Sequence, residues 1–281
     1  MADELIHDLH DHEHEHEDDF SMAFIDTADR LSMLLIHGFP LNSAMWSMQI
    51  DDLNSFARII APDLRGHGNS DAVPGPYSMT QLADDCADIM GHLAVATPFV
   101  VGGLSMGGYV VFEFYRRYPE HVAGLILTAT RAAADPDEAK ANRDAAAANV
   151  AENGINDLVE GMLPKLLSPK NLDDVEMVSF VRDILMKTSV AGAMGALMAM
   201  KDRPDSTPTL AEIDVPTLII HGADDQIVPL AEAEAMHKAI KGSKLVVLKN
   251  AGHLPNLEQP DAFNDAVIDF LEGIEAGLTE E

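Results

Sequence analysis

The chain has 281 residues, of which 47 are Asp or Glu and 18 are Lys or Arg, so its formal net charge is −29 at pH 7 with neutral histidines. A surface this acidic repels nucleic acid and anionic membranes, which argues against both as partners. No apolar run approaches the roughly 20 residues that a bilayer crossing needs, and the length suits a globular protein with a substantial core.

Cysteine usage and the N-terminal composition bear on the compartment. Cys86 is the one cysteine, so no intrachain disulfide can form. The first residues are acidic rather than basic and then apolar, a pattern that does not predict a secretory signal. These features favour a cytoplasmic protein. The acidity has two explanations that the sequence leaves open: adaptation to high salt, which screens self-repulsion, or an ordinary acidic, highly soluble enzyme.

Residues 1–19 form an acidic tail rich in histidine. His10, His12, His14 and His16 stand at alternate positions, which in an extended strand puts all four on one face, as a weak transition-metal site would require. The charge density of the same residues opposes packing and favours a solvated, disordered tail. We predict the disordered tail, and leave open whether it binds metal.

From residue 20 onward, strand-like and helical patterns alternate, as a doubly wound, mostly parallel α/β sheet requires. The predicted strands cover residues 22–26, 32–36, 57–61, 98–102, 123–128, 215–220 and 244–248. The predicted helices cover residues 43–55, 79–95, 106–118, 231–241 and 260–275. Residues 20–130 and 209–281 are therefore expected to form one α/β core.

Residues 131–208 interrupt this alternation. They contain no convincing strand but four helical patterns, over 136–152, 155–166, 173–187 and 189–201. An all-helical block between two strands predicts an inserted helical lid over a site at the edge of the sheet.

The predicted lid brings candidates for a substrate pocket. Met194 and Met198 lie four residues apart and would share one helix face. Such methionines either line an adaptable apolar acyl pocket or form the core of the lid itself. Trp46 and Arg131 are further candidates for the border of the pocket, and Arg131 is the one candidate cation for a carboxylated substrate.

Residues 103–107, the serine elbow, read Gly-Leu-Ser-Met-Gly directly after an apolar run and before a helical pattern. The order strand, G-x-S-x-G, helix forces a sharp turn that lifts the hydroxyl of Ser105 clear of the sheet, where a base can reach it. The following helix points its N-terminal amides at the place where an oxyanion would form. The motif therefore predicts a nucleophilic serine.

A candidate acid and a candidate base follow Ser105 in the chain order typical of this arrangement. Asp224 and Asp225 lie in a turn after the strand at 215–220, and His253 lies in a turn after the strand at 244–248. Ligands of open parallel sheets bind beyond the carboxyl ends of the strands. We therefore expect these side chains and Ser105 to collect at one rim of the sheet.

Four motifs in this order resemble those of the α/β-hydrolase fold family, over about residues 22–272. They are the runs 34–40 and 61–70, the serine elbow, and the paired acid and histidine turns. Within the family, the chain is most similar to lidded carboxylesterases, 3-oxoadipate enol-lactonase-like proteins and cofactor-free haloperoxidase-like serine hydrolases.

The resemblance implies a role for each residue that matches a family motif. Ser105 would be the nucleophile, His253 the base, and Asp225 rather than Asp224 the acid. The oxyanion-hole donors would be the backbone amides of Phe39 and Met106. Neither a metal nor a cofactor is implied. In the run 61–70 the polar residues are expected to buttress the site rather than to react.

The resulting prediction is a serine hydrolase of the carboxylesterase type, acting on a small-to-medium ester or lactone as its small-molecule substrate. Three alternatives stay open. An enol-lactonase of aromatic catabolism and a perhydrolase of the haloperoxidase type would use the same triad. A ligand-binding receptor could keep the hydrolase fold without turnover. The oligomeric state is not predicted.

Overall fold

The computed structural model describes residues 6–7, 20–27 and 31–279, and its central feature is an eight-stranded sheet with strand order β1-β2-β4-β3-β5-β6-β7-β8. The first two pairings, β1 with β2 and β2 with β4, are antiparallel, and all the others are parallel. The strands are β1 (Ile6–His7), β2 (Phe24–Asp26), β3 (Ser32–Ile36), β4 (Arg58–Pro62), β5 (Phe99–Leu104), β6 (Val122–Thr128), β7 (Thr217–Gly222) and β8 (Lys244–Leu248).

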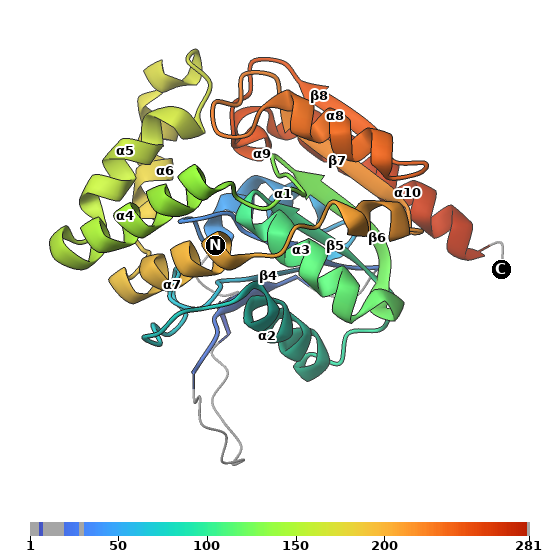
Figure 1. The fold of residues 1–281 in the computed structure, drawn as a ribbon. Coiled ribbons are helices and arrows are strands. Elements are labelled where there is room, and N and C mark those ends of the chain that lie inside the picture. Colours follow the sequence, from blue (N-terminus) through green and yellow to red (C-terminus); the bar gives the residue numbers. More distant parts are fainter. Residues whose placement is uncertain (1–5, 8–19, 28–30, 280–281) are drawn as a thin grey trace.

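Helices cover both faces of the sheet, and alternate residues of a strand pack against opposite faces. In β3, Leu34 and Ile36 belong to one hydrophobic cluster and Met33 and Leu35 to the other. The first cluster is covered by α2, α3 and α8, which lie in front of the sheet in Figure 1, and the second by α1 and α10. These helices are α1 (Ser47–Leu53), α2 (Met79–His92), α3 (Met106–Arg117), α8 (Leu230–Ala239) and α10 (Pro260–Thr279).

The helical insertion, residues 131–208, lies between β6 and β7 and contains no strand, all of its residues being among those described. Its four α-helices gather at one side of the molecule in Figure 1: α4 (Asp137–Asn153), α5 (Asn156–Leu166), α6 (Val175–Leu185) and α7 (Val190–Asp202).

The two ends of the insertion are tied together. The amide of Ser206 donates to the carbonyl of Ala132 (2.9 Å). The fully buried carboxylate of Asp135 pairs with Arg143 and Arg203, one in the first and one just after the last of the four helices. A buried carboxylate is stable only when charged hydrogen bonds compensate its lost hydration.

The predicted fold class, an α/β-hydrolase-type sheet with helices on both faces, is confirmed. The predicted strands and helices are present with ends that differ by a few residues. Several elements, β1 among them, were not predicted. The pattern over 43–55 is split into a 3-10 turn (Ser43–Trp46) and α1, and a short helix α9 (Pro255–Glu258) follows the turn that carries His253.

Of the predicted N-terminal tail, the structure describes only Ile6 and His7. Ile6 and His7 form β1 and pair with Ile25 and Phe24 of β2, so a piece of the tail that we expect to be disordered belongs to the sheet. The alternating histidines from His10 to His16 lie outside the described residues.

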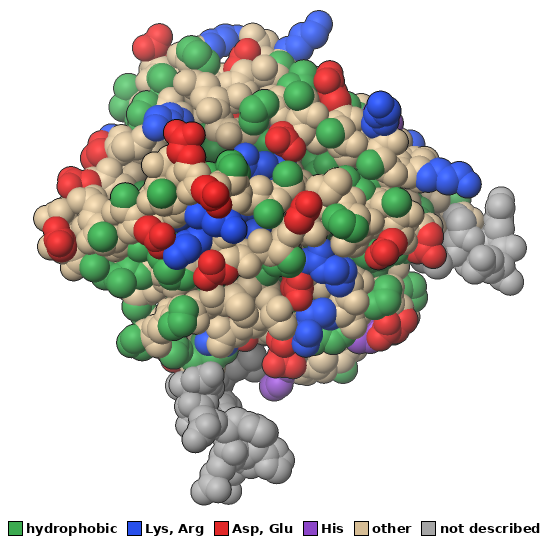
Figure 2. Space-filling view, viewed as in Figure 1, with side chains coloured by type: hydrophobic (Ala, Val, Ile, Leu, Met, Phe, Trp, Pro, Cys, Tyr) green, Lys and Arg blue, Asp and Glu red, His purple; other side chains and the backbone are tan. Residues whose placement is uncertain are grey.

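The surface carries charges of both signs in spite of the net charge of −29. On the face seen in Figure 2, Lys and Arg side chains lie between Asp and Glu side chains rather than in a patch of their own. Of the helices that the structure describes, none combines the length and the apolar character that a bilayer crossing needs.

Candidate active site

The serine elbow is a strained turn held between two strands. Ser105 has φ 55° and ψ −110°, a left-handed conformation that costs a residue with a side chain about 1–3 kcal/mol. Its amide donates to the carbonyl of Thr128 at the end of β6 (2.9 Å), and its carbonyl accepts from the Thr130 hydroxyl (2.8 Å). The surrounding structure thus fixes the strained serine at the carboxyl edge of the sheet.

Glycines around Ser105 allow the elbow to sit this close to its neighbours. A Cβ on Gly107 would lie 2.2 Å from the carbonyl oxygen of Ile36, and a Cβ on Gly103 would lie 2.4 Å from the carbonyl carbon of Gly107. Gly108 lies equally tight against Thr130, at 2.4 Å from its hydroxyl oxygen. The G-x-S-x-G pattern therefore reflects backbone-to-backbone contact with the end of β3.

The acid turn, residues 222–228, follows β7 and places the carboxylate of Asp225 on the ring of His253. The distance from His253 Nδ1 to Asp225 Oδ2 is 2.8 Å, and both side chains are 2% exposed or less. Asp225 Oδ1 also accepts from the amides of Ile227 (2.8 Å) and Val228 (3.0 Å). Asp224, the other candidate acid, is exposed. The carboxylate that contacts the histidine is therefore that of Asp225.

The electrostatics of this pair keep Asp225 charged. Burial by itself would raise the pKa of Asp225, but the His253 charge, the hydrogen bond from His253 and the two backbone amides outweigh it, and the pKa lies below its usual value. Because Nδ1–H of His253 donates to this carboxylate, Nε2 carries the lone pair. The ring is thus in the tautomer that can accept a proton at Nε2.

His221 of β7 is a further buried group at this carboxylate. Its Nε2 lies 3.7 Å from Asp225 Oδ2 and donates to the carbonyl of Val228 (3.0 Å). Burial lowers the pKa of His221, which favours the neutral ring. His221 therefore holds the acid turn in shape without adding a charge.

The predicted oxyanion loop, His37 to Phe39, follows β3 and lies against the serine elbow. A Cβ on Gly38 would lie 3.2 Å from the carbonyl oxygen of Leu104 and 3.4 Å from Cβ of Ser105. Met106 is the first residue of α3, so its amide precedes the hydrogen-bonded turns of the helix. The loop of Phe39 and the amide end of α3 thus both lie next to Ser105.

His37 braces the oxyanion loop as a neutral ring. Its Nε2 accepts from the amide of Leu64 (2.9 Å), so the proton is on Nδ1, which donates to the carbonyl of Gly38 (2.9 Å). Burial lowers the pKa of His37 to about 4. The neighbouring ring of His67, 5.1 Å away between centroids, has its pKa lowered to about 3 by burial and by His37. Both rings are neutral at pH 7.

Asp63, in the run 61–70, joins this run to the segment that follows the predicted oxyanion loop. Its two carboxylate oxygens accept from the amides of Ser43 (2.7 Å) and Asn69 (2.8 Å). Arg65 makes two 2.7 Å hydrogen bonds to Asp85 of α2. These groups are buried and engaged with protein partners, as buttressing groups are.

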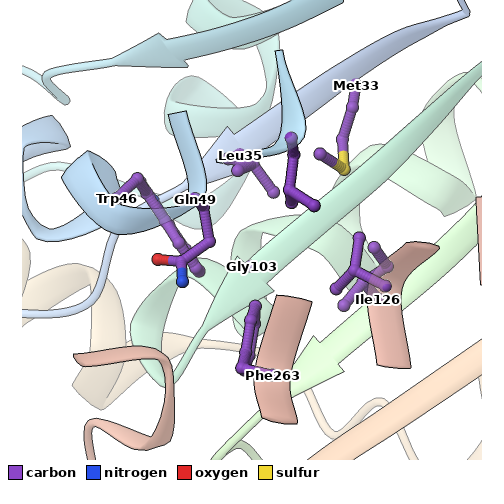
Figure 3. A pocket seen from close by; sticks show the side chains of 9 residues that line it. Met33, Leu35, Trp46, Gln49, Gly103, Ile126 and Phe263 are labelled. Carbon is purple, nitrogen blue, oxygen red and sulfur yellow. The ribbon is translucent and has the colours of Figure 1, made fainter. Parts of the chain in front are cut away.

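The four candidate pocket residues fall into different environments. Trp46 is 1% exposed and packs in the core beneath the sheet, with its ring centroid 6.3 Å from that of Phe263. It lines the pocket drawn in Figure 3, which has no room for a water molecule. The pocket is lined by Met33, Leu35, Trp46, Gln49, Leu53, Gly103, Ile126, Phe263 and Val267. We therefore leave Trp46 out of the proposed substrate pocket.

Arg131, Met194 and Met198 all lie in the helical insertion. Arg131 pairs with the buried Asp135 (3.1 Å), which Arg143 and Arg203 share, so its guanidinium is already engaged. Met194 and Met198 are half-buried on α7 and pack against the cluster on the α2–α3 side of the sheet.

The chain is similar to known proteins over most of its length. It is 32% identical over 246 residues to 3-oxoadipate enol-lactonase 2 of Acinetobacter baylyi, an alignment that covers 87% of this chain and 90% of the relative. The solved structure of a thermophilic esterase from Thermogutta terrifontis is 41% identical, with a TM-score of 0.89 and 91% and 94% of the two chains covered.

A solved enol-lactonase from Burkholderia xenovorans is 27% identical, with a TM-score of 0.83 and 90% and 97% coverage. Residues 32–260 match the family model described as the alpha/beta hydrolase fold. Since that match spans most of the chain and the relatives are covered almost to their full length, the chain belongs to the alpha/beta hydrolase fold family.

Proposed function

We propose that this chain is a serine hydrolase of the carboxylesterase type, which cleaves a small-to-medium ester or lactone through an acyl-enzyme on Ser105. The observation that carries the proposal is the buried 2.8 Å hydrogen bond between Asp225 and His253, at the rim that also carries Ser105 in a strained elbow. Esterases and enol-lactonases among the relatives support an ester-hydrolysing activity.

In the proposed reaction, Nε2 of His253 takes the proton of the Ser105 hydroxyl as its oxygen attacks the acyl carbon, and returns it to the leaving alcohol. Water, activated by the same ring, then releases the acid from the acyl-enzyme. Asp225 keeps the ring in the required tautomer and stabilises the imidazolium without becoming protonated. The lowered pKa of Asp225 supports this role, since the carboxylate stays ionised.

The tetrahedral intermediate carries a negative oxygen, for which we propose the backbone amides of Phe39 and Met106 as donors. Met106 begins α3, so the positive end of the helix dipole adds to its donor. Losing one such donor costs about 3 kcal/mol of transition-state stabilisation in known cases. The helical insertion would act as the lid that covers this site and shapes the acyl pocket.

Hydrolysis of p-nitrophenyl esters from acetate to decanoate, measured for wild type and Ser105→Ala in parallel, tests the proposal. We expect turnover by the wild type and a loss on the order of 10³-fold or more in Ser105→Ala. The optimum chain length would size the pocket. Turnover that is absent, or equal in the two proteins, would reject the serine esterase.

An enol-lactonase is the second candidate, and the 32% identity to 3-oxoadipate enol-lactonase 2 favours it. Such a substrate carries a carboxylate, whereas Arg131 is engaged by Asp135 in this structure. Kinetics on a pair of lactones with and without a carboxylate separates the candidates. A kcat/KM at least about 100-fold higher for the carboxylated lactone than for any ester would favour the enol-lactonase. The same assays with hydrogen peroxide as acceptor test the perhydrolase.

A further inference from the structure

The segment 166–171, which joins α5 to the following helical turns of the insertion, runs along both loops of the predicted acid–base pair. The amide of His253 donates to the carbonyl of Leu166 (2.9 Å). The hydroxyl of Ser168 reaches the carbonyl of Asn250 (3.3 Å), and the amide side chain of Gln226, beside Asp225, reaches the carbonyl of Leu167 (3.4 Å). The insertion is thus bonded directly to the backbone around the histidine.

One buried carboxylate joins this segment to the histidine loop, residues 250–258. Glu258, at the end of α9, is 6% exposed. Its Oε1 accepts from the amide of Gly252 (2.6 Å), and its Oε2 accepts from the amide of Ser168 (2.7 Å) and from Nδ2 of Asn171 (2.8 Å). Every one of these donors lies next to His253 or on the insertion.

The chemistry of the three donors requires a carboxylate. Two N–H groups approach one oxygen of Glu258 and a third approaches the other, so both oxygens must accept. A carboxylate offers acceptors on both oxygens, whereas an amide side chain offers an acceptor on one side and a donor on the other. Hydrogen bonds to a buried charge are also stronger than those between neutral groups.

The contact between the two chain segments leaves little slack. A Cβ on Gly252 would lie 2.6 Å from the amide nitrogen of Ser168 and 2.7 Å from the carbonyl carbon of Leu167. Asn250 has φ 57°, so the loop turns sharply just before this contact. The position of the His253 backbone therefore follows that of the insertion.

We propose that Glu258 is a positioning residue, which fixes the ring of His253 against Asp225 by clamping the histidine loop to segment 166–171 of the insertion. It does not touch substrate. The consequence for catalysis rests on the proposed function, whereas the consequence for the His253 ring does not. Movement of a reacting group by about 1 Å can cost on the order of 100-fold in rate.

The test compares Glu258→Gln with Glu113→Gln. Glu113 is a matched control, because its carboxylate is also buried (9% exposed) but bonds to Arg116 on the far part of α3 and to Thr80 of α2. We expect Glu258→Gln to lower kcat for the best p-nitrophenyl ester by about 10- to 100-fold with little change in KM. Glu113→Gln should retain the wild-type kcat and KM.

A second readout is independent of turnover. We expect the proton on Nδ1 of His253, which donates to Asp225, to give a downfield resonance in proton NMR spectra, which His253→Gln would assign. We expect this signal to weaken or shift in Glu258→Gln and to remain in Glu113→Gln. Asn171→Ala, which removes one of the three donors, should change both readouts in the same direction by a smaller amount, and it serves if Glu258→Gln does not fold.

The outcomes separate the two proposals. A wild type without ester or lactone turnover, together with a signal that changes in Glu258→Gln or Asn171→Ala, would reject the proposed function and keep the positioning role. A lowered melting temperature with unchanged kcat and an unchanged signal below that temperature would overturn the positioning role. An equal loss of kcat in Glu113→Gln would also overturn it, because the effect would then be one of stability.

Discussion

The serine elbow and the histidine loop lie at the same rim of the sheet, yet their contacts come from different parts of the molecule. The elbow contacts the sheet, since glycines let its backbone touch the end of β3 and its amide bonds to the end of β6. The histidine loop also touches the sheet, because a Cβ on Gly222 of β7 would lie 2.0 Å from the carbonyl oxygen of Gly252, but its Glu258 carboxylate and its His253 amide bond to the insertion as well. The proposed nucleophile is thus held at the sheet, whereas the proposed base is also tied to the insertion.

This difference bears on how such a site can vary. A steric arrangement tolerates no added atoms but needs no particular partner outside the sheet. A loop that is tied to the insertion can be shifted by it, so a change in the insertion can reach the proposed base without disturbing the proposed nucleophile. The following predictions test the two sides of the site separately.

The largest effect is expected on the acid–base side, from Asp225→Asn. An amide at this position can donate to the ring of His253 and so favours the wrong tautomer, which in a comparable triad lowers kcat on the order of 10⁴-fold. Steady-state kinetics on p-nitrophenyl esters measures the loss. Asp224→Asn is the matched control, one residue away and exposed, and should leave kcat near the wild-type value. Similar losses in the two variants would remove Asp225 from its proposed role.

The close backbone contacts of the serine elbow predict a large loss of stability from Gly107→Ala. Its Cβ would lie 2.2 Å from the carbonyl oxygen of Ile36 and 2.8 Å from that of His37, and neither backbone group can move freely. We expect the free energy of unfolding to fall by about 3 kcal/mol or more, measured by urea titration.

Gly273→Ala provides the control for this substitution. Gly273 lies in α10, and its added Cβ would meet nothing within 4 Å. Alanine in place of an open helical glycine should raise stability by about 0.5–1 kcal/mol. A loss in Gly107→Ala no greater than that of an ordinary surface change would show that the elbow relaxes, contrary to the steric account.

The two histidines beside the predicted oxyanion loop make the stability of the fold depend on pH. The pKa of His37 is about 4 and that of His67 about 3 in the folded protein, against an ordinary value of 6.5. Above pH 6.5 both rings are neutral whether the chain is folded or not, so the stability is complete. As the pH falls below 6.5 the unfolded chain takes up protons first, and stability is lost until the folded rings titrate near pH 4 and pH 3.

The size of the stability loss follows from the difference between the pKa of each ring in the folded and the unfolded chain. For His37 it amounts to about 3 kcal/mol by pH 4, at roughly 1.4 kcal/mol per pH unit. Urea unfolding at pH 7.0, 5.5 and 4.5 measures it, and His67→Asn, which removes one of the two groups, should show a shallower decline. The same slope in wild type and variant would mean that other groups control the acid sensitivity.

The fold and the chain order of the candidate site could be predicted from the sequence, because both depend on local patterns. The strand at 244–248 and the strand at 32–36 are found as predicted, since each contains a short continuous apolar run. The bond between Ser168 and Glu258 joins residues 90 positions apart. No local pattern signals such a pair, so the clamp on the histidine loop could be found only once the insertion was seen against it.

For Trp46, by contrast, the position in the sequence suggests a place at the border of the substrate pocket that the structure does not support. It follows the oxyanion loop closely, but the 3-10 turn at Ser43–Trp46 directs the indole into the core rather than toward the rim. The sequence pattern predicts one helix over residues 43–55. It does not predict that the chain changes direction between the 3-10 turn and α1. Side-chain direction at the junction of two helical turns is decided by tertiary packing.

The smallest effect is therefore expected from Trp46→Phe. Among the described residues, the buried Nε1–H of Trp46 finds no hydrogen-bond acceptor, so its removal relieves an unsatisfied donor. The smaller ring leaves a gap beside Phe263 that costs a comparable amount. The two contributions should leave the free energy of unfolding within about 1 kcal/mol of wild type. Because the indole lies beneath the sheet, kcat/KM across the ester series should keep its chain-length optimum, and a shifted optimum would return Trp46 to the substrate pocket.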